Sequence, residues 1–394
     1  MKIQLPLGYQ YSSVYAGIRK VERDDLALII SDQPANAAAV FTQNLVAAAP
    51  VVLSRQNLAI SKGKVKALLI NAGNANCATR TGAKVAETSV DAVADLAACD
   101  PAQVLPSSTG VIGVELDVKK ITKALPALFA GLSASRFEDV ARAILTTDLV
   151  MKTASETITL KQGKVRIAGM TKGSGMIQPN MATTLGYLMC DAAIPAPALQ
   201  KILTRATQLS YNRLTVDGDT STNDTVVLLA NGASGVKPSA AELQLVAEAV
   251  TRVMQNLAAQ IARDGEGAKK LIRVLVSGAK SEADAEKIGR AIANSPLVKT
   301  AIGGSDPNWG RIICAAGYSG ANFLPAATDI YLQGKRVCKA GLAAPFDEAK
   351  LKAKLDAKDV VIDLRIAGAG KGSAEFWTCD FTEGYIEING SYRT

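Results

Sequence analysis

Short apolar runs alternate along this chain with alanine-rich segments of helical periodicity, and this alternation sets the fold class. Within residues 240–262 the apolar side chains recur every three or four positions, so they fall on one face of a helix. Ser239 stands before this segment as a candidate N-cap, and Glu242 makes the first turn acidic. The pattern predicts a mixed α/β fold with helices packed on sheets, but it does not give the order of the strands.

The remaining segments follow the same two periodicities. Strands are expected at residues 26–31, 51–54, 66–71, 157–160, 165–170, 185–191, 225–231, 272–277 and 360–366. Helices are expected at residues 82–98, 135–145, 240–262, 282–294 and 346–355. Loops rich in glycine and small residues fall at 71–82, 106–113, 172–184, 215–224, 303–310 and 384–390. Because loops carry most binding and catalytic groups, functional residues are expected in these stretches.

Length and charge narrow the class of protein. A chain of 394 residues, 48% of them hydrophobic, can form two or three globular units, and no repeat or linker marks a boundary. There is no apolar run of membrane-spanning length and no secretory signal layout, so we expect a cytoplasmic protein without a membrane partner. The net charge of +8 is scattered without a basic tract, which argues against nucleic-acid binding. A mild positive excess can instead attract small acidic substrates.

The chain contains no histidine, and this absence excludes several chemistries. Ser-His-Asp and Cys-His nucleophile systems, histidine bases and histidine-ligated metals are all ruled out. The six cysteines are widely spaced without a C-x-x-C pair, so we expect reduced structural thiols, no metal and no cofactor. An enzyme of this composition must take its base from lysine, a carboxylate, tyrosine or a free α-amine.

The densest group of special residues is the loop 172–185, which reads KGSGMIQPNMATTL. Its glycines and proline predict a tight loop that places Thr183 at the start of an apolar strand. If the Ala182–Thr183 bond is strained, the Thr183 hydroxyl can attack the Ala182 carbonyl carbon, and hydrolysis of the resulting ester frees the Thr183 amine. An α-amine with a pKa of about 7.7–8.0 can then serve as the base for its own hydroxyl. Spacing alone would also fit an ordinary turn, and the order of a phosphate-binding loop is missing.

Four further stretches carry weaker signals. Residues 106–113 read PSSTGVIG and could present N–H groups and a hydroxyl towards an oxyanion, or form a plain turn. Residues 146–148 (TTD) and 264–267 (DGEG) follow expected helices and could be simple caps or turns. Residues 216–224 have the acidic spacing of a calcium loop, but they lack its final glutamate and precede a strand, so a metal site is not favoured.

Taken together, these motifs resemble the ornithine acetyltransferase family, also called the glutamate N-acetyltransferase or ArgJ family. The resemblance spans nearly the whole chain. It is carried by KGSGMIQPNMATTL at 172–185, NAGNANCATRTG at 71–82, SSTGVIG at 107–113, TTD at 146–148, DGDTSTNDTV at 217–226, RDGEGA at 263–268, GSDPNWGRI at 304–312 and the ending YIEINGSYRT.

The resemblance implies an α/β fold of mixed sheets in a self-cleaved, two-piece chain, unlike the usual N-terminal nucleophile (Ntn) hydrolases. The α piece would be residues 1–182 and the β piece residues 183–394, assembled as two α and two β pieces. The implied reaction is ping-pong and belongs to arginine biosynthesis. Thr183 takes acetyl from N²-acetylornithine, releases ornithine and passes the acetyl group to glutamate. Whether acetyl-CoA also serves as the donor is left open.

The family's functional residues carry over onto this sequence by motif. They are the cleavage site Ala182 and Thr183, the oxyanion-hole pair Thr109 and Gly110, and the substrate-binding positions Thr146, Lys172, Thr183, Glu266, Asn389 and Thr394. Lys172 could bind a substrate carboxylate or depress the pKa of the nearby amine, and Glu266 could pair with the amino group of ornithine. Asn389 and Thr394 are at the C-terminus, so their match implies that the tail folds back over the site.

Two positions depart from the family pattern. Leu149 stands where a threonine is common, and Thr184 stands where methionine is common, which leaves some ambiguity about the bond that breaks. Two other functions also stay open. A self-processed aminopeptidase or amidohydrolase would pass the acyl group to water, and a binding protein without catalysis would remain one intact chain.

Overall fold

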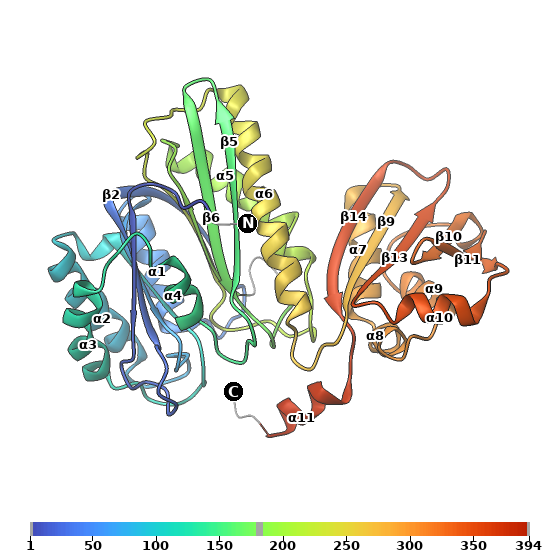
Figure 1. Ribbon diagram of the computed structural model, residues 1–394, viewed down its shortest axis with the longest axis horizontal. Coiled ribbons are helices and arrows are strands. Elements are labelled where there is room, and N and C mark those ends of the chain that lie inside the picture. Colours follow the sequence, from blue (N-terminus) through green and yellow to red (C-terminus); the bar gives the residue numbers. More distant parts are fainter. Residues whose placement is uncertain (1–2, 179–183, 392–394) are drawn as a thin grey trace.

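The computed structural model describes residues 3–178 and 184–391, which form two lobes (Figure 1). The strands of the first lobe are β1 (Tyr9–Val14), β2 (Leu26–Phe41), β3 (Lys64–Asn71), β4 (Val104–Ser108), β5 (Lys152–Leu160), β6 (Gly163–Lys172), β7 (Leu185–Cys190) and β8 (Thr225–Ala230). Its helices are α1 (Ala49–Ile60), α2 (Gly82–Ala97), α3 (Val118–Ala130), α4 (Phe137–Ala143), α5 (Ala196–Gln208) and α6 (Ala240–Arg263).

The strands of the first lobe form one mixed sheet in the order β4-β3-β2-β8-β7-β6-β5, and β1 also pairs with β2. The pairs β3–β4 and β7–β8 are parallel, and the other pairs are antiparallel. Strands from both sides of residues 182–183 therefore share this sheet, because β6 pairs directly with β7. The α and β pieces expected from the sequence therefore both contribute strands to the sheet of the first lobe.

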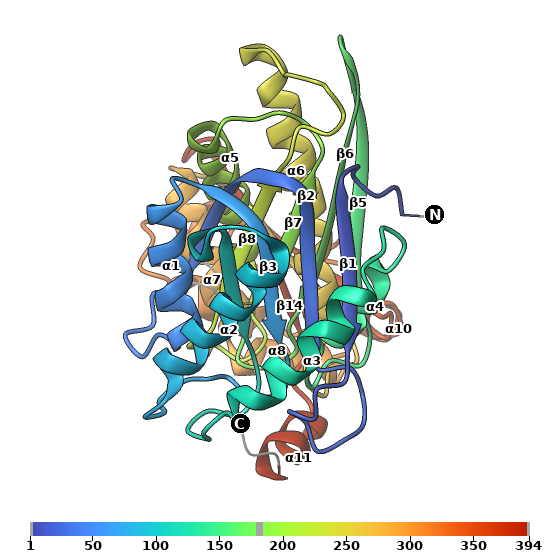
Figure 2. The ribbon, with the colours of Figure 1, turned by 90° about the vertical axis from the view of Figure 1, so that its left-hand side faces the viewer.

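This sheet folds over so that its two halves cover each other. Along β2, Ala27 and Ile29 join an inner cluster, whereas Leu26 and Leu28 face α2 and α3. The same alternation in β6, β7 and β8 sends one set of side chains to the inner cluster and the other set to α5 and α6. Among the buried residues that the structure describes in this cluster, α4 is the only helix represented, so the strands largely bury one another. Figures 1 and 2 show α1–α3 outside one half of the sheet and α5 and α6 outside the other.

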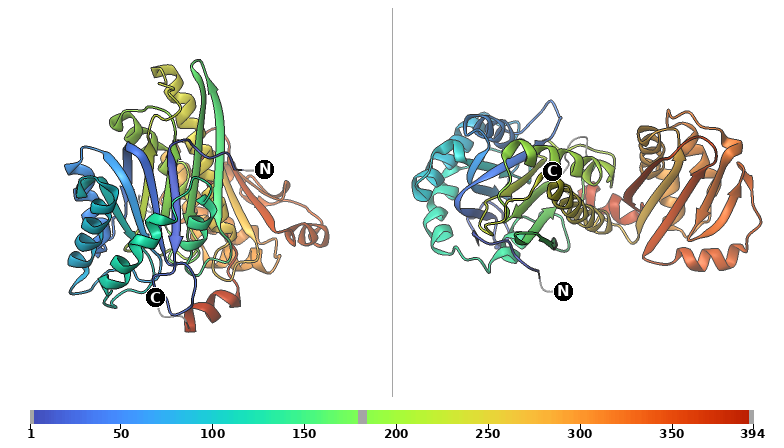
Figure 3. Two further views of the ribbon diagram at one scale, coloured as in Figure 1. Left: turned by 60° about the vertical axis from the view of Figure 1, so that its left-hand side comes forward. Right: turned by 90° about the horizontal axis from the view of Figure 1, so that it is seen from above.

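The second lobe is a smaller α/β unit (Figure 3). Its strands are β9 (Leu271–Ala279), β10 (Thr328–Leu332), β11 (Lys335–Lys339), β12 (Leu342–Ala343), β13 (Asp359–Ile366) and β14 (Gly372–Cys379). Its helices are α7 (Glu282–Asn294), α8 (Pro296–Gly303), α9 (Trp309–Gly317) and α10 (Glu348–Leu355), and α11 (Glu383–Ser391) follows β14. The strand order is β12-β11-β10-β13-β9-β14, in which only β13 and β9 are parallel. After β14 the chain returns to the first lobe through α11 (Figure 1).

The lobes meet at the base of β9 and β14. Trp377 and Cys379 of β14 pack into the core cluster of α5 and α6. Lys299 of α8 is buried at the junction and donates hydrogen bonds to the Val216 carbonyl oxygen and to Thr378. Within the described ranges, no helix combines the length and the apolar content that a bilayer crossing needs.

Most sequence-based elements are confirmed, and one is wrong. The capping box at the start of α6 is present, because Ser239 Oγ accepts from Glu242 N while Glu242 accepts from Ser239 N. Residues 51–54, expected as a strand, lie inside α1. Pro50 occupies the first turn of this helix, where a missing N–H costs nothing. The four-residue apolar run was too short to separate the two periodicities.

Candidate active site

One cavity of about 230 Å³ gathers the described residues that the sequence assigned to the site. They are Thr109, Gly110, Thr146, Lys172, Glu266 and Asn389. Ala182, Thr183 and Thr394 lie outside the described residues. Gly175 and Met176 line the cavity just before this gap. Just after it, Thr184 borders an adjoining space of about 30 Å³ together with Thr109 and Lys172.

These residues lie at the ends of several different elements of the fold or in the loops and helices that follow them. Thr109 and Gly110 follow β4, and Lys172 is the last residue of β6. Thr146 follows α4, Glu266 lies in the turn after α6, and Asn389 lies on α11. The cavity is therefore built where several elements of the first lobe end, and α11 closes it from the second lobe's side.

The loop after β4 presents a hydroxyl rather than a free amide at Thr109. The Thr109 backbone N–H donates to the Asn71 carbonyl oxygen at 2.9 Å. The Thr109 hydroxyl oxygen accepts from Lys172 Nζ at 3.4 Å, so its own proton points to another acceptor. Gly110 has φ +133°, and a Cβ there would lie 2.6 Å from the Gly73 carbonyl carbon. Only glycine fits this close backbone approach.

A buried ion network lies directly behind Lys172. Lys152 Nζ is 2.7 Å from Asp148 Oδ1 and 2.5 Å from Asp264 Oδ2, and the Lys152 side chain has no exposure. Asp148 also accepts from Gly173 N at 2.6 Å and from Thr146 N at 3.0 Å. The network therefore fixes the backbone on both sides of the cavity.

The charges of this network shift two pKa values. Burial alone would raise the pKa of Asp148, but the positive charges of Lys172 and Lys152 outweigh it and hold this pKa below its usual range. Burial lowers the pKa of Lys172, and Asp148, 3.8 Å away, opposes that shift. Lys172 is thus a buried amine beside a carboxylate that stays ionised.

Glu266 is held between the glycine-rich loop and the C-terminal helix. Its carboxylate lies over the Cα of Gly175, where any Cβ would overlap it. Asn389 Nδ2 donates to Glu266 Oε2 at 2.8 Å. Gly267, with φ +71°, packs against the backbone of Tyr385, and Thr382 donates to the Gly267 carbonyl oxygen at 2.6 Å. The turn after α6 and α11 therefore form one docked unit.

The acidic loop 216–224 supports the glycine-rich loop. Asp217 accepts from Met176 N at 2.6 Å and from Ile177 N at 2.8 Å. Thr220 donates to the Gln178 carbonyl oxygen at 2.9 Å. Among the described residues, no group of three or more Cys, Asp and Glu side chains is placed to hold a metal ion. The Asp217 carboxylate is instead occupied by the backbone of residues 176–177.

Sequence reasoning missed several residues of the cavity. Asp217 and Asn223 belong to a quoted motif that was given no role, and Tyr385 also lines the space. Tyr385 stands four residues before Asn389, a spacing that puts both on one face of a helix and could have revealed it. Burial raises the pKa of Tyr385, and the nearby Asp217 and Glu266 charges raise it further. Tyr385 therefore faces the cavity as a neutral phenol.

Asp224 is a deeply buried acid at this site. Burial raises its pKa well above the usual range, although the charge of Lys172 opposes this shift. The neighbouring Asn223 donates to the Ala75 and Ser108 carbonyl oxygens at 2.7 and 2.8 Å. These bonds tie the acidic loop to the loop that carries Thr109.

The fold and the cavity define a class: a mixed α/β protein with a polar, histidine-free site built around a buried lysine. A family model described as the ArgJ family matches residues 10–394. The chain belongs to the ArgJ family.

Two relatives agree with this assignment, and one solved structure is also similar to this chain. The arginine biosynthesis bifunctional protein ArgJ of Nitratidesulfovibrio vulgaris is 45% identical over 391 residues, which cover 99% of each chain. The protein of the same name from Chlorobaculum tepidum is 45% identical and covers 99% of this chain and 96% of its own. The crystal structure of arginine biosynthesis bifunctional protein ArgJ from Bacillus halodurans is 40% identical, with a TM-score of 0.49, and covers 51% of this chain and 96% of that one.

Proposed function

We propose that this protein is an acetyltransferase of arginine biosynthesis that moves the acetyl group of N²-acetylornithine to glutamate through an acetyl ester on Thr183. Thr183 becomes available when the chain cleaves itself at Ala182–Thr183 into pieces 1–182 and 183–394. Membership of the ArgJ family supports the general activity. The observation that carries the site is the convergence of Thr109, Lys172 and Glu266 on one cavity beside Thr184.

The choice of Thr183 over its neighbour is supported by the bonds of Thr184. The Thr184 hydroxyl is buried and donates to the Lys172 carbonyl oxygen. Its oxygen also lies 3.0 Å from the Thr171 hydroxyl. A hydroxyl whose proton is held in this way is a poor nucleophile, so the Ala182–Thr183 bond is the better candidate for cleavage.

In the proposed mechanism the free Thr183 amine removes the proton of its own hydroxyl as that hydroxyl attacks the acetyl carbonyl carbon. The amide C–N bond of N²-acetylornithine then breaks, and the Thr183 ammonium returns the proton to the departing amino group of ornithine. The positive charge of Lys172 favours the neutral form of this amine. The Thr109 hydroxyl and the Gly110 N–H donate to the oxyanion that develops. The Lys172 bond to Thr109 Oγ1 polarises the Thr109 hydroxyl and makes it a better donor.

Substrate selection in this proposal depends on Glu266 and Asn389. The Glu266 carboxylate pairs with the side-chain amino group of ornithine, and Asn389 keeps the carboxylate oriented. Lys172 attracts the substrate carboxylate. With α11 over the cavity, water is kept from the acetyl ester until glutamate enters.

The test is a denaturing gel with N-terminal sequencing, followed by a transfer assay. The wild type should give two fragments, one of which begins Thr-Thr-Leu-Gly. Thr183→Ala should remain one inactive chain, whereas Thr184→Ala should still cleave. Ornithine release from N²-acetylornithine should depend on glutamate. Equal release without glutamate would instead indicate a hydrolase, and a single uncut wild-type chain would indicate a protein without this chemistry.

A further inference from the structure

The uncut chain lacks the base that the proposed transfer uses. The α-amine of Thr183 exists only after the Ala182–Thr183 bond has broken, because until then its nitrogen belongs to an amide, which does not take up protons at neutral pH. The chain also contains no histidine. Self-cleavage therefore needs another group to take the proton of the Thr183 hydroxyl, and the candidates are lysine, carboxylate and tyrosine side chains.

The lysine and the tyrosine of the active site are suited to donate protons rather than to accept them. Lys172 Nζ donates to Thr109 Oγ1 at 3.4 Å and lies 3.8 Å from Asp148, which stays ionised and favours the protonated amine. Tyr385 is a neutral phenol whose pKa is raised by burial and by nearby acidic charges. A carboxylate is therefore the better candidate for the base.

Two carboxylates of the active-site cavity are already engaged. Glu266 Oε2 accepts from Asn389 Nδ2 at 2.8 Å, and Asp217 accepts from the backbone N–H groups of residues 176–177. Both side chains line the larger cavity rather than the space of about 30 Å³ beside Thr184. Neither acid is therefore placed next to the end of the chain segment in which cleavage is proposed.

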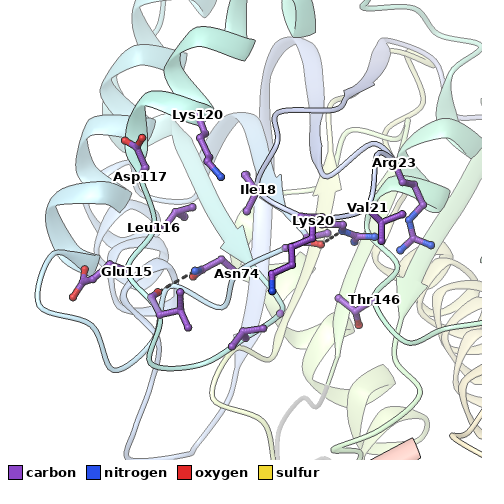
Figure 4. Close-up of a pocket in the computed structure, with 16 residues that line it drawn as sticks. Ile18, Lys20, Val21, Arg23, Asn74, Glu115, Leu116, Asp117, Lys120 and Thr146 are labelled. Atoms are coloured by element: carbon purple, nitrogen blue, oxygen red, sulfur yellow. Dashed lines mark hydrogen bonds between the residues drawn. The ribbon is translucent and has the colours of Figure 1, made fainter. Parts of the chain in front are cut away.

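The neighbouring cavity of about 820 Å³ has two carboxylates on its wall, and these are engaged as well (Figure 4). Glu115 accepts from Arg80 N at 2.7 Å, and Asp117 accepts from Lys119 N at 3.0 Å. Figure 4 shows both carboxylates on the side of that cavity away from Thr146, the residue that this cavity shares with the active site. They are too far to the side to serve the active site as bases.

Asp224 is placed differently from these four acids. It stands one residue before β8, and Thr184 stands one residue before β7. The two strands are parallel with Leu185 opposite Thr225, and Thr225 N donates to the Thr184 carbonyl oxygen at 2.9 Å. Asp224 and Thr184 also border the same space of about 30 Å³. The sheet thus fixes this acid beside the residue that directly follows Thr183 in the chain.

The Asp224 carboxyl group also has an oxygen available for a proton. Asp224 is 2% exposed, and its Oδ2 has no hydrogen-bond partner among the described residues. Burial raises its pKa, and this effect outweighs the opposing charge of Lys172 and the hydrogen bonds of Ser221. A carboxylate in these surroundings takes up a proton more readily than an exposed one. Position, an unengaged oxygen and proton affinity therefore agree.

We propose that Asp224 is the base of self-cleavage, taking the proton of the Thr183 hydroxyl as that hydroxyl attacks the Ala182 carbonyl carbon. This inference rests on the proposed function, because it concerns the same bond. A C–O bond forms, the C–N bond breaks, and Asp224 passes the proton to the Thr183 nitrogen, which becomes an amine. Water then attacks the ester carbonyl carbon, and the ester C–O bond breaks. One water proton passes through the new amine to the Thr183 oxygen, and Ala182 ends as a carboxylic acid.

The test follows cleavage of the full-length chain on a denaturing gel at intervals after its synthesis. Asp224→Asn keeps the shape of the side chain but cannot take the proton, so cleavage should slow by at least about 100-fold. The matched control is Asp219→Asn, which removes the same charge from an exposed acid of the same loop and should cleave within about twofold of the wild-type rate. The urea midpoint of uncut Asp224→Asn should match that of uncut Thr183→Ala.

Chemical rescue separates a base from a structural side chain. Asp224→Ala should remain uncut, and added formate should restore its cleavage, because formate is a small carboxylate and the space beside Asp224 adjoins the active-site cavity at Thr109 and Lys172. Formamide, which has a similar shape but is not a base, should not restore cleavage. The proposal is overturned if Asp224→Asn cleaves as fast as Asp219→Asn, if formate restores nothing, or if formamide works equally well.

The same gels distinguish failure of this inference from failure of the proposed function. Cleavage of Asp224→Asn at the wild-type rate, with Thr183→Ala uncut, removes only the role of Asp224. An uncut wild type, or a Thr183→Ala chain that is still cut, removes the proposed function itself. If Asp224→Asn has a lower urea midpoint than Thr183→Ala, the formate experiment decides, since formate does not refold a damaged chain.

Discussion

The two lobes differ in the kinds of side chains that they bury. The first lobe buries charged side chains around its cavity, among them Asp148, Lys152, Lys172 and Glu266. Within residues 271–379, the only buried charged side chain is Lys299, and it points to the junction with the first lobe. The second lobe therefore has an ordinary apolar core, while the first keeps costly polar groups in place with hydrogen bonds and ion pairs. Such a division is typical of a protein in which one part carries the chemistry and another part supports it.

The largest effect is expected from a substitution that breaks the ion network of the first lobe. Lys152→Met leaves Asp148 and Asp264 buried without their cation, so the free energy of unfolding should fall by about 3–5 kcal/mol. Urea unfolding measures this change. Lys358→Met, at an exposed position before β13, should change stability by less than about 0.5 kcal/mol. A loss below about 1 kcal/mol for Lys152→Met would mean that the network contributes little.

A second test uses acid. Because the folded pKa of Asp148 lies below its ordinary value, its contribution is present above about pH 4 and is lost as the pH falls through the folded pKa. Between pH 5 and pH 3 the wild type should lose at least about 1 kcal/mol more unfolding free energy than Asp148→Asn. Asp359→Asn, a half-exposed site in the second lobe, should follow the wild-type curve. If the wild type and Asp148→Asn lost stability equally as the pH falls, the pKa of Asp148 would not be lowered in the folded protein.

The third test separates backbone strain from docking of the C-terminal helix. Gly267 and Gly334 have φ angles of +71° and +76°, but only a Cβ at Gly267 collides with α11. Gly334→Ala should lose about 1 kcal/mol of stability to backbone strain, and Gly267→Ala should lose more, because its Cβ would lie 2.2 Å from Tyr385 N. Only Gly267→Ala should raise the KM for N²-acetylornithine, by about tenfold, because it displaces Asn389 from Glu266. Equal KM values for the two variants would show that α11 does not contribute to binding.

The smallest expected effect concerns a departure from the family pattern. Leu149 is 84% exposed, although its N–H donates to Asp264. Leu149→Thr keeps that backbone bond, so stability should stay within about 0.5 kcal/mol. The rate of ornithine release should stay within about twofold of wild type. A larger gain in activity would indicate that a hydroxyl at this position does take part.

Periodicity predicted the regular parts of both lobes, because long amphipathic segments such as α6 carry many consistent signals. It failed at residues 51–54, where four apolar residues are compatible with either a strand or a helix. The ion network could not be predicted, since Lys152 and Asp264 are 112 residues apart and the packing of α6 against β5 brings them together. The site residues came from motif resemblance, and spacing alone did not distinguish Thr109 or Glu266 from turn residues.

The pairing of β6 with β7 has a consequence for how this protein would be handled in the laboratory. If the chain is cut between residues 182 and 183, the strands 167–172 and 185–190 still form one ladder. The two fragments should then co-purify as one particle and part only in denaturant. The segment 1–182 produced alone would leave the edges of β6 and β2 unpaired, and such open edges favour aggregation. Production as a single precursor avoids this hazard, because both halves of the sheet are present before any bond is cut.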